Sequence, residues 1–262
     1  MKITNTGDIS TTDIPVYMLI YGAGGIGKTT FAASAPGAFM ADCENGSKFL
    51  GSRGIKIPVA QIETWYDFAG EGQFVDMAIK SDKTHTIVVD PIGELMEKCK
   101  QGLTGSALVT PDGAPTIRGW GEMSIRMKAQ FRKLRDSGKH VILIAHVEEK
   151  EDEGRMVKRP KIQTKISEDI VNMVDIVGYM LAVTDAEGET KRAIFVDGTN
   201  DKIVAKDRTS KLTKYVKPDF NEIYQAIQGV DVPAAPIPVQ EVVKEDGRAV
   251  KLAAAKEKLR GN

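Results

Sequence analysis

The sequence has little cysteine, no net charge and no long apolar run, and each absence narrows the possible classes of protein. Only two of its 262 residues are cysteines, Cys43 and Cys99, and their spacing suits neither a disulfide framework nor a zinc cluster. The 36 basic and 36 acidic residues cancel, so any affinity for nucleic acid must come from local patches. No apolar stretch approaches the roughly 20 residues of a membrane span, and the N-terminus lacks a signal pattern. We therefore expect a soluble cytoplasmic protein without a membrane partner.

One glycine-rich segment carries the clearest functional signal. The apolar run 16–21 is followed by the sequence GAGGIGKT, which matches the pattern G-x-x-x-x-G-K-[ST], and helix-forming residues continue to Pro36. In such a loop the backbone N–H groups cradle phosphates, the lysine reaches the β- and γ-phosphates and the threonine ligates Mg²⁺. The segment predicts a P-loop, with a glycine-rich turn without ligand as the alternative. The residues expected around the nucleotide are Gly22, Ala23, Gly24, Gly25, Ile26, Gly27, Lys28, Thr29 and Thr30.

Short apolar runs alternate with helical patterns through the first 146 residues. Such runs are typical of parallel strands that are buried on both faces. The predicted fold class is therefore α/β, a mostly parallel sheet with helices on both faces. We predict strands over 16–21, 38–41, 58–62, 85–90 and 141–146, helices over 65–80, 94–101 and 119–136, and a loop over 102–118.

The pattern changes after residue 146. Hairpin strands are expected to continue the sheet in the antiparallel sense. Prolines at 233, 236 and 238 then mark a linker. We therefore divide the chain into a nucleotide-binding domain over 1–230 and a Pro/Ala linker with a charged tail over 231–262. The elements predicted here are a charged loop over 147–165, a helix over 166–174, strands over 176–183, 191–196 and 202–206, and helices over 218–228 and 240–259.

Three acidic residues at the ends of predicted strands are candidates for the chemistry. Asp90 ends an aliphatic strand, where it would hold Mg²⁺ opposite Thr29, although such an aspartate also caps helices. Hydrolysis further requires a group that orients and deprotonates water, and Glu44 is our candidate. Asp42 is its competitor, and both residues equally fit a turn before the pair Asn45 and Gly46.

The segment FMADCENG, residues 39–46, resembles the strand and D-x-E-G segment of RecA- and RadA-type recombinases. The likeness extends over most of residues 14–230, and it is strongest to the small RecA-like ATPases of phages that act in single-strand annealing or recombination. It implies a RecA-like P-loop core that uses ATP and Mg²⁺, in which Glu44 activates water. It also implies a phage-encoded protein in the cytoplasm of a bacterial host.

Two further positions match the same family. His146 closes the strand after Asp90, where recombinases place a polar sensor that couples the γ-phosphate to DNA binding. The segment 205–208 resembles the K-x-R finger with which related hexameric helicases reach a neighbour's nucleotide, so Lys206 and Arg208 would act in a homo-oligomer, a ring or a filament. From the residues themselves, His146 equally fits a buried histidine bonded to backbone, and Lys206 and Arg208 fit a solvent-facing strand edge.

Two segments are candidates for contacting single-stranded DNA. The charged segment 147–165 follows the sensor position, and an ordinary solvated loop is its alternative. Segment 102–118 ends near Trp120, whose ring would either stack on a base or pack in the core. We expect an ATPase that binds single-stranded DNA and assists annealing, recombination or repair, with a single-strand-binding protein as a further partner. Two other functions stay open: a P-loop kinase for a small acceptor, and a nucleotide-gated assembly switch with little turnover.

Overall fold

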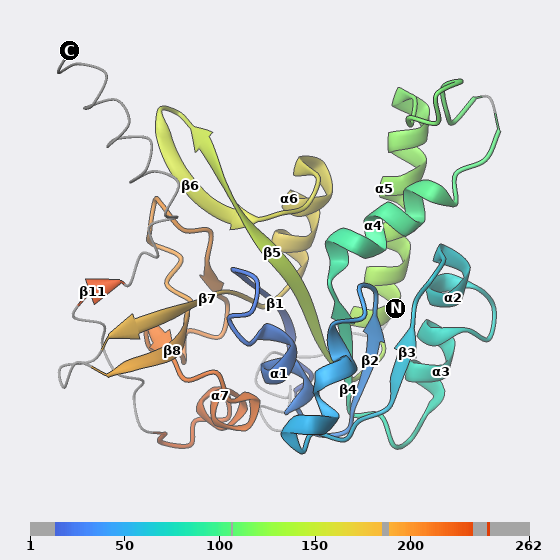
Figure 1. The fold of residues 1–262 in the computed structure, drawn as a ribbon. Helices are drawn as coiled ribbons and strands as arrows, with labels where there is room; N and C mark the ends of the chain where they lie inside the picture. The colour runs from blue at the N-terminus through green and yellow to red at the C-terminus, as the bar shows by residue number, and fades with distance from the viewer. Residues whose placement is uncertain (1–13, 106, 185–188, 233–239, 242–262) are drawn as a thin grey trace, which may run out of the picture.

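The computed structural model describes residues 14–105, 107–184, 189–232 and 240–241. A β-sheet runs through its centre with helices on both faces (Figure 1). Six parallel strands follow the order β3-β2-β4-β5-β1-β7, and β8 and β10 extend the sheet in the antiparallel sense, which confirms the predicted α/β class. These strands are β1 (Tyr17–Gly22), β2 (Ala38–Asp42), β3 (Val59–Gln61), β4 (Thr86–Asp90), β5 (His140–Asp152), β7 (Ile176–Thr184), β8 (Thr190–Phe195) and β10 (Tyr215–Val216).

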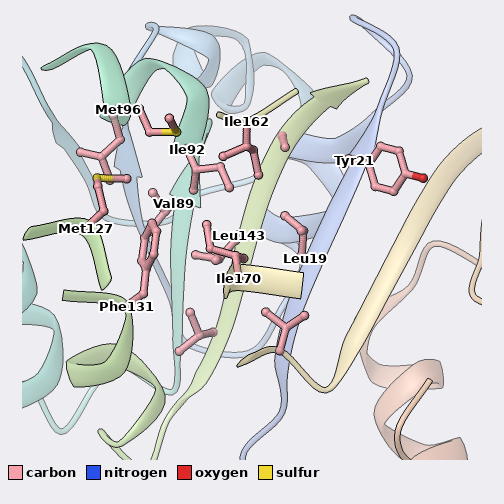
Figure 2. Close-up of a cluster of buried hydrophobic side chains, with 14 of the residues drawn as sticks. Leu19, Tyr21, Val89, Ile92, Met96, Met127, Phe131, Leu143, Ile162 and Ile170 are labelled. Atoms are coloured by element: carbon pink, nitrogen blue, oxygen red, sulfur yellow. The ribbon is translucent and has the colours of Figure 1, made fainter. Parts of the chain in front are cut away.

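Two hydrophobic clusters, one on each face of the sheet, hold the helices. Alternate residues of β1 divide between them, because successive strand side chains point to opposite faces: Leu19 joins one cluster and Ile20 the other. Figure 2 shows the first cluster, in which Leu143 and Val89 of the sheet lie near Phe131. This cluster includes residues of α2 (Trp65–Ala69), α3 (Phe74–Lys80), α4 (Ile92–Gln101), α5 (Ile117–Arg135) and α6 (Thr164–Met173), and the second includes residues of α1 (Lys28–Ala33) and α7 (Phe220–Ile227).

The strand order gathers the candidate residues at one edge of the sheet. In the register of the parallel pairs, Gly22 lies beside His146, and Asp42 lies beside Asp90. Because all these strands point the same way, their carboxyl ends meet at a single edge, where α/β sheets bind their ligands. Within the described part of the chain, no helix is both long and apolar enough to cross a membrane.

The structure corrects the predicted helix over 65–80. Two short helices, α2 and α3, replace it, and they are separated by a turn that contains Gly70 and Gly72. Gly72 has φ +70°, which favours glycine, and a Cβ at Gly70 would lie 2.6 Å from the Tyr66 ring. The two glycines therefore end the first helix, whereas the apolar spacing suggested one continuous element.

The predicted charged loop over 147–165 is wrong for most of its length. Strand β5 continues to Asp152 and pairs with β6 (Arg155–Pro160) in an antiparallel hairpin that projects from the sheet (Figure 1). The predicted strand over 202–206 is also reduced, to a bridge at Ile203 and the short strand β9 (Lys206–Asp207). In place of a helix start at residue 240, the structure has a two-residue strand, β11 (Gln240–Glu241), paired with β7. The rest of the predicted tail, residues 242–262, lies outside the described residues.

Candidate nucleotide-binding site

The P-loop connects β1 to α1, as its sequence predicts. Gly25 and Gly27 have φ of +73° and +112°, so both adopt the left-handed backbone that glycine allows. Gly22 is required for another reason, because a Cβ there would lie 2.5 Å from the carbonyl oxygen of Met180 on β7. These glycines shape a loop whose backbone turns at the start of α1, which is the arrangement that binds phosphate.

The P-loop lysine folds back over its own loop. Lys28 is 6% exposed, and its Nζ donates hydrogen bonds to the carbonyl oxygens of Gly22 at 2.9 Å and Ala23 at 2.8 Å. Burial lowers the pKa of Lys28, and the negative charges of Asp90 and Glu44 act against this shift. The ammonium group is thus held at the loop by neutral carbonyl groups that phosphate oxygens would replace.

Asp90 and Thr29 have the chemistry expected of a Mg²⁺ site. Asp90 is 5% exposed at the end of β4, accepts a hydrogen bond from the Thr29 hydroxyl, and has an Oδ2 with no hydrogen-bond partner among the described residues. Burial raises the pKa of Asp90 to about 6, with a smaller contribution from the charge of Glu44, while the Thr29 hydrogen bond and the charge of Lys28 act against this shift. A buried carboxylate oxygen without a partner is stabilised by a cation, so both residues fit Mg²⁺.

The protein contributes few ligands to this cation. Among the described residues, no group of three or more His, Cys, Asp or Glu side chains could hold a metal. Mg²⁺ commonly binds through one or two protein oxygens together with substrate phosphates and water. The site therefore fits a cation that enters with the nucleotide, held by Thr29 and Asp90.

Glu44 and His146 meet across the same site. His146 Nε2 lies 3.3 Å from Glu44 Oε2, and each side chain is 38% exposed. The alternative of a buried histidine bonded to backbone is therefore not what the structure shows. Because the two residues lie 102 positions apart in the chain, only the fold could bring this carboxylate and imidazole together.

Asp42 shapes the turn that carries Glu44. It is 2% exposed, and its two carboxylate oxygens accept hydrogen bonds from the backbone N–H groups of Glu44, Gly46 and Ser47 and from the Ser47 hydroxyl. Burial acts to raise the pKa of Asp42, but the hydrogen bonds from these groups outweigh it and hold the pKa below its ordinary value. Asp42 Oδ2 also accepts a hydrogen bond from Gln61 Nε2 on β3 at 3.4 Å. The carboxylate of Asp42 is thus engaged within the protein, and this separates it from its competitor Glu44.

A cavity of about 230 Å³ joins these groups. Its lining includes Lys28, Thr29, Glu44, Asp90 and His146, so the structure brings together the predicted catalytic and metal-binding residues of the first 146 positions. A larger hollow of about 430 Å³ lies beside α7 and is not lined by any P-loop residue. We assign the smaller cavity as the site because it alone of the two combines the phosphate loop with a buried carboxylate.

Sequence reasoning missed three residues of this lining. Phe49 and Arg53 end two short 3₁₀ helices, Gly46–Phe49 and Gly51–Arg53, that follow the turn of Glu44, and Leu50 lies between these helices. Arg53 Nη1 donates to the Thr30 hydroxyl oxygen at 3.0 Å. The sequence carries no periodic signal for such short helices, so only their position after the D-x-E segment indicated proximity to the site.

Lys206 and Arg208 lie at the other end of the sheet. Lys206 pairs with the beginning of β7, whereas the P-loop follows the carboxyl end of β1. Its Nζ donates to the carbonyl oxygens of Val171, Asn172 and Val174, which close α6, and burial lowers its pKa. Arg208 bonds the Asp175 carboxylate at 3.2 Å. Within this chain both residues cap α6, and a role at a neighbour's nucleotide stays a prediction.

The strand order, the P-loop and the carboxylate at the end of β4 are the features of a P-loop NTPase. Residues 14–209 match the model of a family described as an AAA domain. This match covers most of the chain, so the protein belongs to that AAA-domain family. No curated protein matches it in sequence.

Distant structural likenesses accompany the family match. A KaiC-like protein from the hyperthermophilic archaeon Pyrococcus horikoshii is similar with a TM-score of 0.44 and 17% identity, over 70% of this chain and 78% of its own. The flagellar accessory protein FlaH from Methanocaldococcus jannaschii gives a TM-score of 0.42 and 11% identity, over 78% and 85%. At this distance neither likeness carries an argument about function.

Proposed function

We propose that this protein is a Mg²⁺-dependent ATPase that binds single-stranded DNA and assists its annealing, recombination or repair. The observation that carries the proposal is the contact between Glu44 and His146 beside the P-loop, at 3.3 Å. A carboxylate at this place is available to take a proton from water, and a histidine that holds it lies on the strand that leaves the site.

The chain's own groups account for hydrolysis. Lys28 would exchange its bonds to loop carbonyls for bonds to phosphate oxygens, and the Glu44 carboxylate would orient the attacking water and accept its proton. Mg²⁺ held by Thr29 and Asp90 would neutralise charge on the phosphates. His146 positions Glu44, and the products are ADP and inorganic phosphate.

Strand β5 links this site to a surface far from it. His146 lies in the middle of β5, and the strand continues without a break for six more residues to Asp152 at the hairpin turn. At about 3.4 Å per residue this is a distance of roughly 20 Å. If hydrolysis changes the contact between Glu44 and His146, a shift of His146 would move the paired, continuous strand β5. This supports coupling between the nucleotide and the hairpin.

The basic residues of the hairpin are largely engaged within the protein. Arg159 lies 3.6 Å from Glu148, Arg155 lies 2.6 Å from Asp201, and the Lys158 ammonium lies over the Tyr179 ring. These contacts leave less positive charge for DNA than the sequence suggests. We therefore assign the main DNA contact to the start of α5 and give the hairpin a supporting role.

The start of α5 offers the groups that bind single strands. Arg118 is exposed, and Trp120 is 37% exposed and lies outside both hydrophobic clusters, so its ring can stack on a base. The segment 107–116 before this helix and the hairpin project from the same end of the molecule (Figure 1). A strand of DNA that contacts both would lie across that end.

ATP hydrolysis measured with and without single-stranded DNA, at low and high salt, tests the proposal. We expect DNA to raise the rate at low salt, Arg118→Glu and Trp120→Ala to remove the stimulation, and Arg132→Glu to retain it. Arg132 is an exposed arginine of the same helix, 14 residues or about 21 Å further along, and so serves as the matched control. A rate that DNA leaves unchanged at low salt would overturn the DNA-binding part of the proposal.

The same assay separates the two other functions. A phosphorylated acceptor without free phosphate would establish the kinase. Nucleotide-dependent assembly with negligible turnover would establish the switch. We further propose a homo-oligomer, and light scattering with and without ATP and DNA tests it, since a monomer under all conditions would refute assembly.

A further inference from the structure

A basic side chain outside the predicted site lies directly over the P-loop. The Arg192 guanidinium on β8 has Nη1 3.1 Å and Cζ 3.5 Å from the place that a Cβ on Gly27 would occupy. Strand β7 separates β8 from β1, so this side chain extends over β7 to reach the loop. Arg192 lies two residues before Ile194, which packs in the cluster that contains α1, and it therefore stands on the α1 face of the sheet.

The guanidinium of Arg192 makes no hydrogen bond or ion pair with any residue that the structure describes, and Arg192 is exposed. The neighbouring Lys191, on the opposite face, has an ion pair with Glu189 at 3.3 Å. A planar guanidinium with free N–H groups beside a loop of backbone N–H groups is suited to bind phosphate through two parallel hydrogen bonds.

The position of Arg192 selects one part of the nucleotide. Glu44 follows β2, and Asp90 and His146 lie on β4 and β5, all on one side of β1. In the proposed function they mark where the γ-phosphate is cleaved. Arg192 arrives from the other side, over Gly27, whose loop cradles the α- and β-phosphates. We propose that Arg192 binds the α- or β-phosphate of the nucleotide within its own chain, as a nucleotide-binding residue that takes no part in the cleavage. The proposal rests on the nucleotide site of the proposed function and is independent of DNA.

Binding of fluorescent ADP and ATP analogues to Arg192→Ala, Arg192→Lys and the control Lys191→Ala tests this role. We expect Arg192→Ala to weaken both nucleotides by the same factor, roughly tenfold to hundredfold. The affinity of Arg192→Lys should fall between those of Arg192→Ala and the original protein, because a single ammonium replaces the planar guanidinium. Lys191→Ala should bind as the original protein does, and the unfolding midpoint without nucleotide should be the same for all four proteins.

Two results would overturn the proposal. Unchanged affinity in Arg192→Ala would make this arginine an ordinary surface residue. A loss confined to ATP, with a lower rate at saturating ATP, would place it at the γ-phosphate instead. Failure of the proposed function is distinguishable, because absent hydrolysis or absent DNA stimulation would leave the ADP measurement and its interpretation intact.

Discussion

Replacing Asp42 by Asn isolates the residue that holds the turn of Glu44. The carboxylate accepts bonds from three backbone N–H groups and one hydroxyl at a position that is 2% exposed. The amide of asparagine keeps only one oxygen. Depending on its orientation, either the backbone N–H of Ser47 or those of Glu44 and Gly46 lose their acceptor, and the remaining hydrogen bonds no longer go to a charged group. With hydrogen bonds to charged groups contributing about 1.5 to 3 kcal/mol, we expect Asp42→Asn to destabilise the fold by about 2 to 3 kcal/mol.

Thermal and urea unfolding without nucleotide measure this effect. For a domain of this size, about 2 to 3 kcal/mol corresponds to a midpoint lower by roughly 4 to 12 °C. The matched control is Asp112→Asn, because Asp112 is an exposed aspartate that accepts a hydrogen bond from the Thr110 hydroxyl. We expect this control to leave the midpoint unchanged.

The pH dependence follows from the depressed pKa of Asp42. Because this pKa is lower in the folded protein than in the unfolded chain, the stabilisation is fully present above about pH 4 and is lost as the pH falls through the folded value. The difference between the original protein and Asp42→Asn should therefore shrink in acid. A midpoint equal to that of the original protein at pH 7 would refute the role assigned to Asp42.

Three further changes test other contacts of the site and the sheet. Thr29→Ala should raise the Mg²⁺ concentration needed for half-maximal hydrolysis at least tenfold, and an unchanged requirement would contradict the metal assignment. His146→Ala should lower the rate, and its effect should largely vanish when Glu44 is already Gln, since the two residues contact each other; additive losses would show that they act separately. Lys206→Met should destabilise the protein by about 1 to 3 kcal/mol, because three carbonyl groups at the end of α6 lose a charged donor. The unfolding midpoint measures this effect, and an unchanged midpoint would contradict the capping role and favour a role of Lys206 between subunits.

The sheet and the P-loop were predictable from the sequence because their signals are local. The apolar runs at β1, β4 and β5 come from burial on both faces, and the glycines of the P-loop have few other uses in that order. Asp90 followed from its place at the end of such a run. Each of these inferences needed only neighbours along the chain.

The parts that the sequence did not predict depend on contacts between distant segments. The segment of the β5–β6 hairpin is highly charged, so its sequence indicated a solvated loop. In the structure the opposite charges lie across from each other, Glu148 beside Arg159 and Glu149 beside Lys158, and this pairing exists only once the two strands meet. The approach of Arg192 to Gly27 crosses an intervening strand. No local pattern encodes such a meeting, and a three-dimensional structure is needed to find it.

The most direct test of the account is ATP hydrolysis by Glu44→Gln, measured beside nucleotide binding. Lys28→Ala serves as the blank and Glu71→Gln, an exposed glutamate between α2 and α3, as the matched control. The account predicts a rate that falls at least hundredfold in Glu44→Gln while the affinity for ADP changes less than about threefold, because general-base groups contribute about 10²- to 10⁴-fold. A Glu44→Gln protein that hydrolyses ATP at the original rate would contradict the assignment of this site.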